Sequence, residues 1–211
     1  MTKRLLNAAI ATAVMLAWTA CSESPKPTPA EKTAAEKTAE APKPPEPVAA
    51  QTAFYEMYKP ARTWAADLLP LSLSSGEVSS LKNEGGKAAT WTAVFVSPGR
   101  HEARTFFYSV VSDPERISKG VTAGGSQPWS GPTAKSQPFQ ITGFVVNSDA
   151  AYNAALVKAS AWVKHHPDKK VTFILGSTAR FPSPAWLVLW GTPKLGYAVY
   201  VDATTGKVTA R

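Results

Sequence analysis

Residues 186–211 read WLVLWGTPKLGYAVYVDATTGKVTAR, and this stretch decides the fold class. Residues 186–190 are an unbroken run of bulky, β-favouring side chains, and residues 197–201 are a second run after a turn that contains glycine and proline. A further turn at 202–206 precedes a short third run. The pattern predicts two or three antiparallel strands at this end of the chain.

A similar pattern occurs earlier in the chain. Trp91 begins a run of the same kind as the one at Trp186, and each run is followed by a hydroxyl residue and a proline. Both runs also lead to a tyrosine and, five residues later, an aspartate: Tyr108 and Asp113 in the first, Tyr197 and Asp202 in the second. We therefore expect an α+β fold of two repeated units, each a helix packed on an antiparallel β-sheet.

The N-terminus has the features of a secretory signal. Lys3 and Arg4 precede an apolar segment over residues 5–17, which at about a dozen residues is too short to span a bilayer core of roughly 30 Å. We assign residues 1–20 to a signal peptide, and the protein is therefore expected to leave the cytoplasm.

Cys21 is the only cysteine, and it closely follows the apolar segment. This position resembles the lipobox of bacterial lipoproteins, in which the cysteine is lipidated and becomes the first mature residue. The resemblance implies membrane attachment through lipid on Cys21; an ordinary signal peptide cleaved nearby is the alternative. Ser22 follows, which implies the outer membrane rather than the inner one, with the protein facing the periplasm. Without another thiol, the folded part has no disulfide.

Residues 21–51 are rich in Ala, Pro, Lys and Glu and lack large apolar side chains until Val48. Such a segment cannot bury enough apolar surface to fold. We expect a disordered tether, whose thirty or so residues would reach up to roughly 90 Å at about 3.1 Å per residue.

Residues 52–211 form the expected globular part. They contain 17 basic and 10 acidic residues, a net charge of +7. A basic surface suits anionic lipid, phosphate-bearing envelope polymers or an acidic protein, although it is also consistent with a simply solvated surface. Nucleic acid is not an expected partner of an exported protein.

We divide the globular part into three segments. In the first unit, residues 52–120, Pro60 is expected to begin the main helix and Pro70 to end it, with strands at 90–97 and 105–111. Residues 121–140 have little periodicity and are expected to be a long crossover loop with a short strand or two. The second unit, residues 141–211, begins with a predicted strand at 141–146. An amphipathic helix then follows the capping residues at 147–149 and ends before Pro167.

The strand end Val201-Asp202 and the turn closed by Gly206 resemble the closing hairpin of PepSY-like domains. The chain as a whole also looks like an uncharacterised bacterial lipoprotein family with paired helix-plus-sheet units. Its architecture is similar to that of β-lactamase inhibitory proteins, although no residue motif carries that comparison. The resemblance implies a non-catalytic module, related in some members to the restraint of peptidases or to sensing in the envelope.

The sequence contains no recognisable catalytic or metal-binding motif. His165 and His166 end the second helix, where a cation is favoured, and His101 lies in a turn among charged residues. Ser148 and Asp149 are expected to cap the helix. We expect neither a cofactor, nor a bound metal, nor enzymatic activity, while a carboxylate pair formed only in the fold could still make the protein a hydrolase.

Trp129 is the strongest candidate for contact with a partner, because it lies in the expected crossover, where an aromatic ring could stack on a sugar or anchor a protein. It could equally pack the loop onto the core. The basic candidates near it in sequence are Arg100, Arg104, Lys119 and Lys135. The tryptophans at periodic positions, by contrast, are expected in the core: Trp64, Trp162, Trp186 and Trp190.

The sequence thus predicts an envelope lipoprotein that acts by binding. A protein-interaction or inhibitory module is the leading hypothesis, because a tandem repeat occurs without a catalytic set. A module for peptidoglycan or another anionic envelope polymer is the alternative. The sequence does not give the partner or the oligomeric state.

Overall fold

The structure is a computed structural model that describes residues 44–112 and 117–209. The predicted signal peptide, Cys21 and most of the predicted tether lie outside the described residues. All statements about the fold below concern the described part of the chain.

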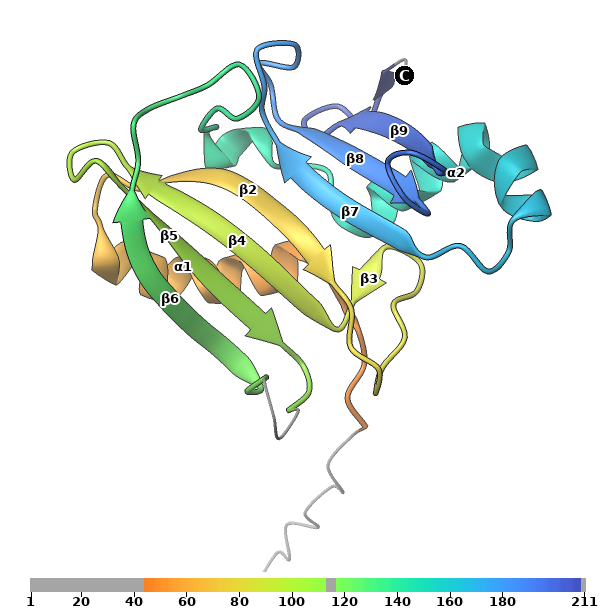
Figure 1. The fold of residues 1–211 in the computed structure, drawn as a ribbon, viewed down its shortest axis with the longest axis horizontal. Coiled ribbons are helices and arrows are strands. Elements are labelled where there is room, and N and C mark those ends of the chain that lie inside the picture. The colour runs from red at the N-terminus through yellow and green to blue at the C-terminus, as the bar shows by residue number, and fades with distance from the viewer. Residues whose placement is uncertain (1–43, 113–116, 210–211) are drawn as a thin grey trace, which may run out of the picture. The chain divides into compact units, whose positions relative to one another are not determined.

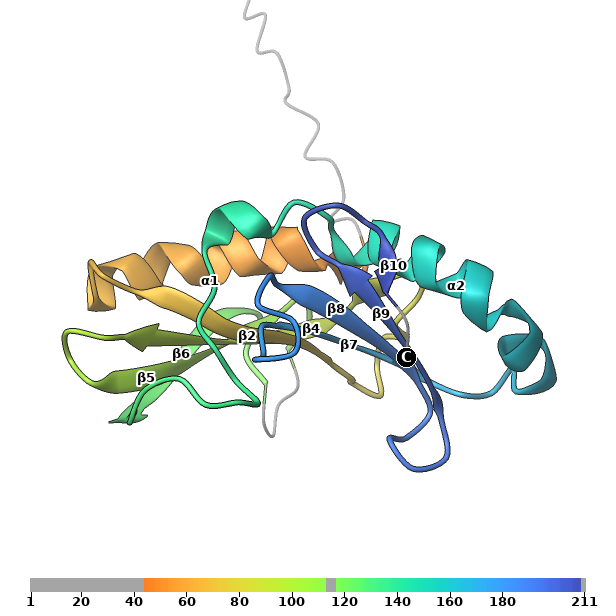
Figure 2. The same ribbon diagram turned by 90° about the horizontal axis from the view of Figure 1, so that it is seen from above.

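An antiparallel sheet of eight strands forms one layer, and two helices form the other. The strands are β2 (Leu69–Gly76), β4 (Thr90–Ser97), β5 (Glu102–Ser109), β6 (Gly120–Pro128), β7 (Val171–Gly176), β8 (Ala185–Trp190), β9 (Tyr197–Asp202) and β10 (Val208–Thr209). Helices α1 (Ala50–Trp64) and α2 (Ser148–His165) cover the same face of the sheet (Figures 1 and 2). The expected α+β class is confirmed.

The sheet order is β10-β9-β8-β7-β2-β4-β5-β6. Each half of the chain therefore supplies a helix followed by four strands of the main sheet, and the first strands of the halves, β2 and β7, pair with each other at the centre. The short strands β1 (Val48–Ala49) and β3 (Lys87–Ala88) form a separate antiparallel pair. One continuous sheet thus joins the halves, and the predicted duplication is compatible with this order without being established by it.

Aromatic side chains fill the space between sheet and helices. The ring of Phe54 on α1 lies 5.5 Å from that of Phe95, and Tyr152 on α2 lies 6.2 Å from Phe173. The largest fully buried side chains include three tryptophans, Trp91, Trp186 and Trp190. Trp186 and Trp190 are thus in the core as expected, whereas Trp64 and Trp162 are only partly buried at its margin.

The N-termini of the two helices meet and share their capping groups. Asn147 caps α2, since its Oδ1 accepts a hydrogen bond from the Ser148 amide at 2.8 Å, and the same oxygen accepts from the Gln51 amide of α1 at 3.0 Å. The buried Ser148 hydroxyl accepts from the Ala50 amide at 2.9 Å. Asn147, the N-cap of α2, and Ser148, its first residue, therefore satisfy backbone donors that α1 could not satisfy itself.

Helix α1 differs from the sequence prediction. It begins at Ala50 rather than near Pro60, and Pro60 lies inside it. The cause is the long-range cap from α2, because the N-cap residue Ala49 makes no side-chain cap of its own. Pro70 does not follow the helix but lies within β2, which has a register irregularity between Pro70 and Ser72.

Two further predictions between the halves were wrong. The expected crossover loop, in which a short strand or two was predicted, instead begins with a nine-residue edge strand, because Gly120–Pro128 pairs with β5. The expected strand at 141–146 is instead a 3-10 turn, Ile141–Gly143, after which the amides of Val145 and Val146 both donate to the Ala203 carbonyl. Tertiary pairing decided both cases against local propensity. The expected helix over the following residues was confirmed.

Candidate functional site

The sheet face away from the helices is the first candidate site, and we call it the open face. Successive side chains of a strand point to opposite faces, and the register shows which residues share one. Trp91 and Phe95 pack under α1, so Thr92 and Val94 between them belong to the open face. Figure 2 shows that no helix covers this side.

The strand positions of the open face are almost all small, hydroxylic or apolar. In register across the sheet they include Leu69, Ser72, Ser74, Gly76, Thr90, Thr92, Val94, Val96, Ala103, Thr105, Phe107, Ser109, Gly120, Thr122, Gln127, Thr172, Ile174, Gly176, Ala185, Leu187, Leu189, Ala198, Tyr200 and Thr209. Of these, Val96, Ala185 and Leu189 are buried although no helix covers them. Charged residues make up 18% of the chain, yet among the strand positions that the structure describes on this face, Asp202 at the end of β9 is the one charged residue.

Asp202 does not bring a free charge onto the open face. Its Oδ1 accepts hydrogen bonds from the amides of Thr204 and Thr205, at 2.9 and 2.7 Å, and from the Thr205 hydroxyl. Desolvation tends to raise the pKa of this carboxyl, but the three hydrogen bonds together lower it below the ordinary value. Asp202 therefore remains ionised and bound within its own turn.

The open face also carries exposed apolar side chains. Phe107 on β5 is 46% exposed and Ile174 on β7 is 37% exposed. At the β9 side, the Phe181 ring stacks on Tyr200 with centroids 4.8 Å apart, and the Arg180 guanidinium lies 5.2 Å above Phe181. The open face thus has apolar and hydroxylic groups in its centre and a cation at this border.

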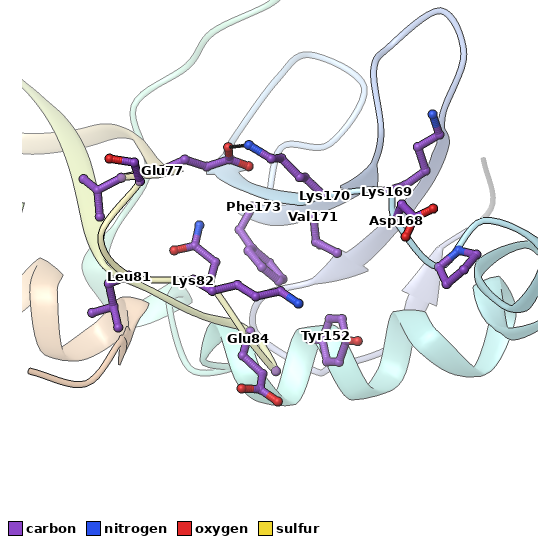
Figure 3. A pocket seen from close by; sticks show the side chains of 16 residues that line it. Glu77, Leu81, Lys82, Glu84, Tyr152, Asp168, Lys169, Lys170, Val171 and Phe173 are labelled. Carbon is purple, nitrogen blue, oxygen red and sulfur yellow. Dashed lines mark hydrogen bonds and ion pairs between the residues drawn. The ribbon is translucent and has the colours of Figure 1, made fainter.

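A pocket of about 590 Å³ is the second candidate site. It lies between the loop at residues 77–86, helix α2, the segment before β7, and β7 itself (Figure 3). Its apolar and aromatic lining consists of Val78, Leu81, Tyr152, Pro167, Val171 and Phe173. The charged lining residues are Glu77, Lys82, Glu84, Asp168, Lys169 and Lys170, of which Lys170 forms an ion pair with Glu77.

A close backbone approach holds one wall of the pocket. Gly86 has φ of +84°, and a Cβ there would lie 2.5 Å from the Cα of Asp149 on α2. Only glycine allows the loop to pass this near to the helix. The sequence analysis described a polar loop here but missed the pocket; the pair Gly85-Gly86 was the available signal.

The predicted site around Trp129 is not a single cluster. Trp129 directly follows β6 and is half-buried, and its amide donates to the His101 carbonyl at 2.8 Å. Lys119 directly precedes β6. With about 3.3 Å per strand residue, this separates it from Trp129 by about 30 Å. Lys135 is exposed within a tight turn between Thr133 and Ser136.

The two predicted arginines have structural contacts. The Arg100 Nη1 donates to the Trp64 carbonyl at 2.9 Å, at the end of α1. The Arg104 Nε donates to the Gly124 carbonyl at 2.8 Å, and its guanidinium lies 5.5 Å from the Phe106 ring centroid. These contacts tie strands and a helix end together, so the structure does not gather the basic candidates around Trp129.

The pKa shifts of two other side chains, Asp67 and Tyr108, also have structural causes. The Ser97 hydroxyl and the Gly99 amide donate to the Asp67 carboxylate at 2.6 and 2.7 Å, and these bonds lower its pKa. Burial, with a smaller contribution from Glu56, raises the pKa of Tyr108. Neither group lines the pocket. Across residues 44–112 and 117–209, no group of three or more metal-ligating side chains occurs, and no helix is long and apolar enough to cross a bilayer.

No protein-family model matches the sequence, and no curated protein does. Among solved structures, the chain is similar to a candidate lipoprotein from Clostridium difficile 630, at 11% identity and a TM-score of 0.45. The match covers 79% of this chain and 91% of the other. A likeness this distant carries no functional argument.

Proposed function

We propose that this protein is a non-catalytic envelope lipoprotein that binds a partner protein through the open face. The observation that carries the proposal is the run of uncharged side chains across this face, with Phe107 and Ile174 exposed within it. The exposed face of an antiparallel sheet ordinarily carries polar, solvated side chains.

The chemistry of the open face favours a protein partner. Docking a partner removes water from the surface, which costs little for hydroxyl and apolar groups and much for charged ones. The cores of protein interfaces are accordingly depleted in charged residues. Because the main-chain ladders hold the strands in place, the face needs little ordering when it binds.

The size of the open face also fits a protein. The seven strands other than β10, about 4.8 Å apart and about 20 Å long, give a gross sheet area of about 700 Å², of the same order as the roughly 800 Å² per partner of a standard interface. The net charge of +7 over residues 52–211 and the cation of Arg180 at the border favour an acidic rim on the partner.

The sequence supports the envelope location. A short signal segment, Cys21 at the lipobox position and a proline-rich tether together favour a lipid-anchored domain held away from the membrane. Replacing the anchor residue, Cys21→Ser, is expected to release the protein from the membrane fraction. Continued membrane attachment of the Cys21→Ser protein would contradict lipidation.

Co-purification from crosslinked envelopes tests the docking surface. Thr92→Arg places a charge at the centre of the open face, and Val157→Arg places the same charge on α2, where Val157 is 76% exposed. We expect the first variant to lose a protein partner that the wild type and the second variant retain. Equal recovery of every partner by the two variants would overturn the proposal.

A further inference from the structure

The wall of the pocket that the loop at residues 77–86 forms is fixed by contacts within the protein. The Asn83 Nδ2 donates to the Gly76 carbonyl at 2.8 Å, and its Oδ1 accepts from the Ala89 amide at 3.0 Å. Gly86 lies directly against the start of α2. The loop therefore needs little ordering when a ligand binds, which lowers the entropic cost of binding.

The floor of the pocket is aromatic. Phe173 on β7 is 2% exposed, and its ring lies 6.2 Å from that of Tyr152 on α2. The Tyr152 ring lies 6.0 Å from that of Trp190, so the floor is continuous with the core. The pocket volume of about 590 Å³ is within the range of ligand-binding pockets, roughly 300–1,000 Å³. A compact ligand with an apolar ring therefore fits this floor.

Four of the six charged lining residues offer no free charge to the cavity. Lys170 and Glu77 form an ion pair and neutralise each other. Figure 3 shows that the side chains of Lys169 and Glu84 extend away from the cavity, on opposite sides of it. The other two charged residues of the lining therefore decide which ligand charge the pocket prefers.

One of these two residues, Lys82, brings an unpaired positive charge over the aromatic floor. Its side chain extends from the loop across the cavity toward Tyr152 (Figure 3). Within residues 44–112 and 117–209, the Lys82 amine forms no ion pair and no hydrogen bond. The other residue, Asp168, lies at the opposite end of the cavity in the same view, so it does not neutralise this amine. The pocket thus combines an apolar floor with an unpaired cation above it.

We propose that this pocket binds a small aromatic carboxylic acid, whose carboxylate accepts from the Lys82 amine while its ring packs on Tyr152 and Phe173. A hydrogen bond between two charged groups is stronger than one between neutral groups, and burial of the ring adds the hydrophobic gain. One amine balances the single charge of a carboxylate, whereas a phosphate monoester carries almost two. This site is on a different surface from the open face and does not depend on the function proposed above.

The experiment titrates phenylacetate into the full chain in detergent by calorimetry, with detergent micelles alone as the blank. Phenylacetamide has the same ring and nearly the same shape without the charge, and we expect it to bind about tenfold more weakly. Lys82→Met removes the amine and keeps an unbranched apolar side chain. We expect it to bind phenylacetate about five- to tenfold more weakly, whereas Lys169→Met, at a lining lysine that extends away from the cavity, should bind within about twofold of the wild type.

A second measurement leaves the protein unaltered and locates the ligand. Phenylacetate is expected to shift the backbone amide NMR signals of residues 77–86 and Tyr152, and to leave those of Thr92 and Phe107 on the open face unchanged. The proposal is overturned if phenylacetate does not bind in the millimolar range, or if the shifts lie outside the pocket. It is also overturned if the amide binds as tightly as the acid, or if Lys82→Met binds phenylacetate as tightly as the wild type.

Discussion

Trp91 and Trp186 make the same hydrogen bond in the two halves of the sheet. The Nε1 of Trp91 donates to the carbonyl of Val48 at 3.0 Å, and that of Trp186 donates to the carbonyl of Val146 at 2.8 Å. Each acceptor lies two residues before the helix of its own half. Both tryptophans are fully buried, and their ring centroids are 6.4 Å apart.

Each tryptophan thus fastens the start of a helix to the second strand of its half. The equivalence of the two bonds supports the duplication predicted from sequence, which remains a prediction. Their ring contact lies where the halves join, so the aromatic core couples one half to the other.

We expect Trp91→Phe and Trp186→Phe to destabilise the protein by similar amounts, about 3 kcal/mol each. Each change leaves a partly buried carbonyl without its donor and creates a cavity. Urea unfolding measures the effect, and Trp64→Phe, at a partly buried position, should cost less than about 1 kcal/mol. Because the two rings touch, the double variant should deviate from additivity. A large loss at only one of the two positions would argue against equivalent halves.

Alanine substitutions at the adjacent residues Gly85 and Gly86 allow a controlled test of how the pocket wall packs on α2. Both have positive φ, +56° and +84°, but only at Gly86 would a Cβ meet the backbone of α2. Gly85→Ala should cost about 1 kcal/mol through backbone strain alone. Gly86→Ala adds the clash and should cost about 3 kcal/mol. Equal unfolding free energies for the two variants would mean that the loop does not pack on the helix in solution.

Asp67 should contribute to the pH dependence of stability. Its hydrogen bonds from Ser97 and Gly99 lower its pKa in the folded state, so the ionised carboxylate stabilises the fold above the ordinary carboxyl pKa of about 3.9. This contribution is lost as the pH falls through the lowered value. Asp67→Asn should therefore be less stable than the wild type near neutral pH, with a difference in unfolding free energy that narrows as the pH falls below about 4. A difference that is constant with pH would contradict this role.

The sequence predicted those elements whose signals are local. Helix α2 has its cap at Asn147 and an apolar face beyond it, and strands β8 and β9 have continuous β-favouring runs. The start of α1 has no such signal, because its caps come from residues nearly a hundred positions away. Strand β6, with Gly124 and Gly125 in its middle, forms because β5 offers an edge to pair with.

The candidate sites were harder to predict than the fold. The lack of charge on the open face becomes visible only when strands from both halves are placed in register. The pocket depends on where β2 and β7 separate, which local sequence does not specify. Trp129 was predicted to contact a partner because it is a tryptophan among prolines and glycines. In the structure, its amide donates to the carbonyl of His101 in the turn before β5, directly after the end of β6.

Site-specific photo-crosslinking in intact envelopes tests the docking of a partner on the open face most directly. A photoreactive amino acid is placed at Phe107 or Ile174 on the open face, or at Val157 on α2 as the control; all three side chains are exposed. The account predicts one and the same protein adduct from Phe107 and Ile174, and none from Val157. Adducts from Val157 alone, or none from Phe107 and Ile174, would contradict it.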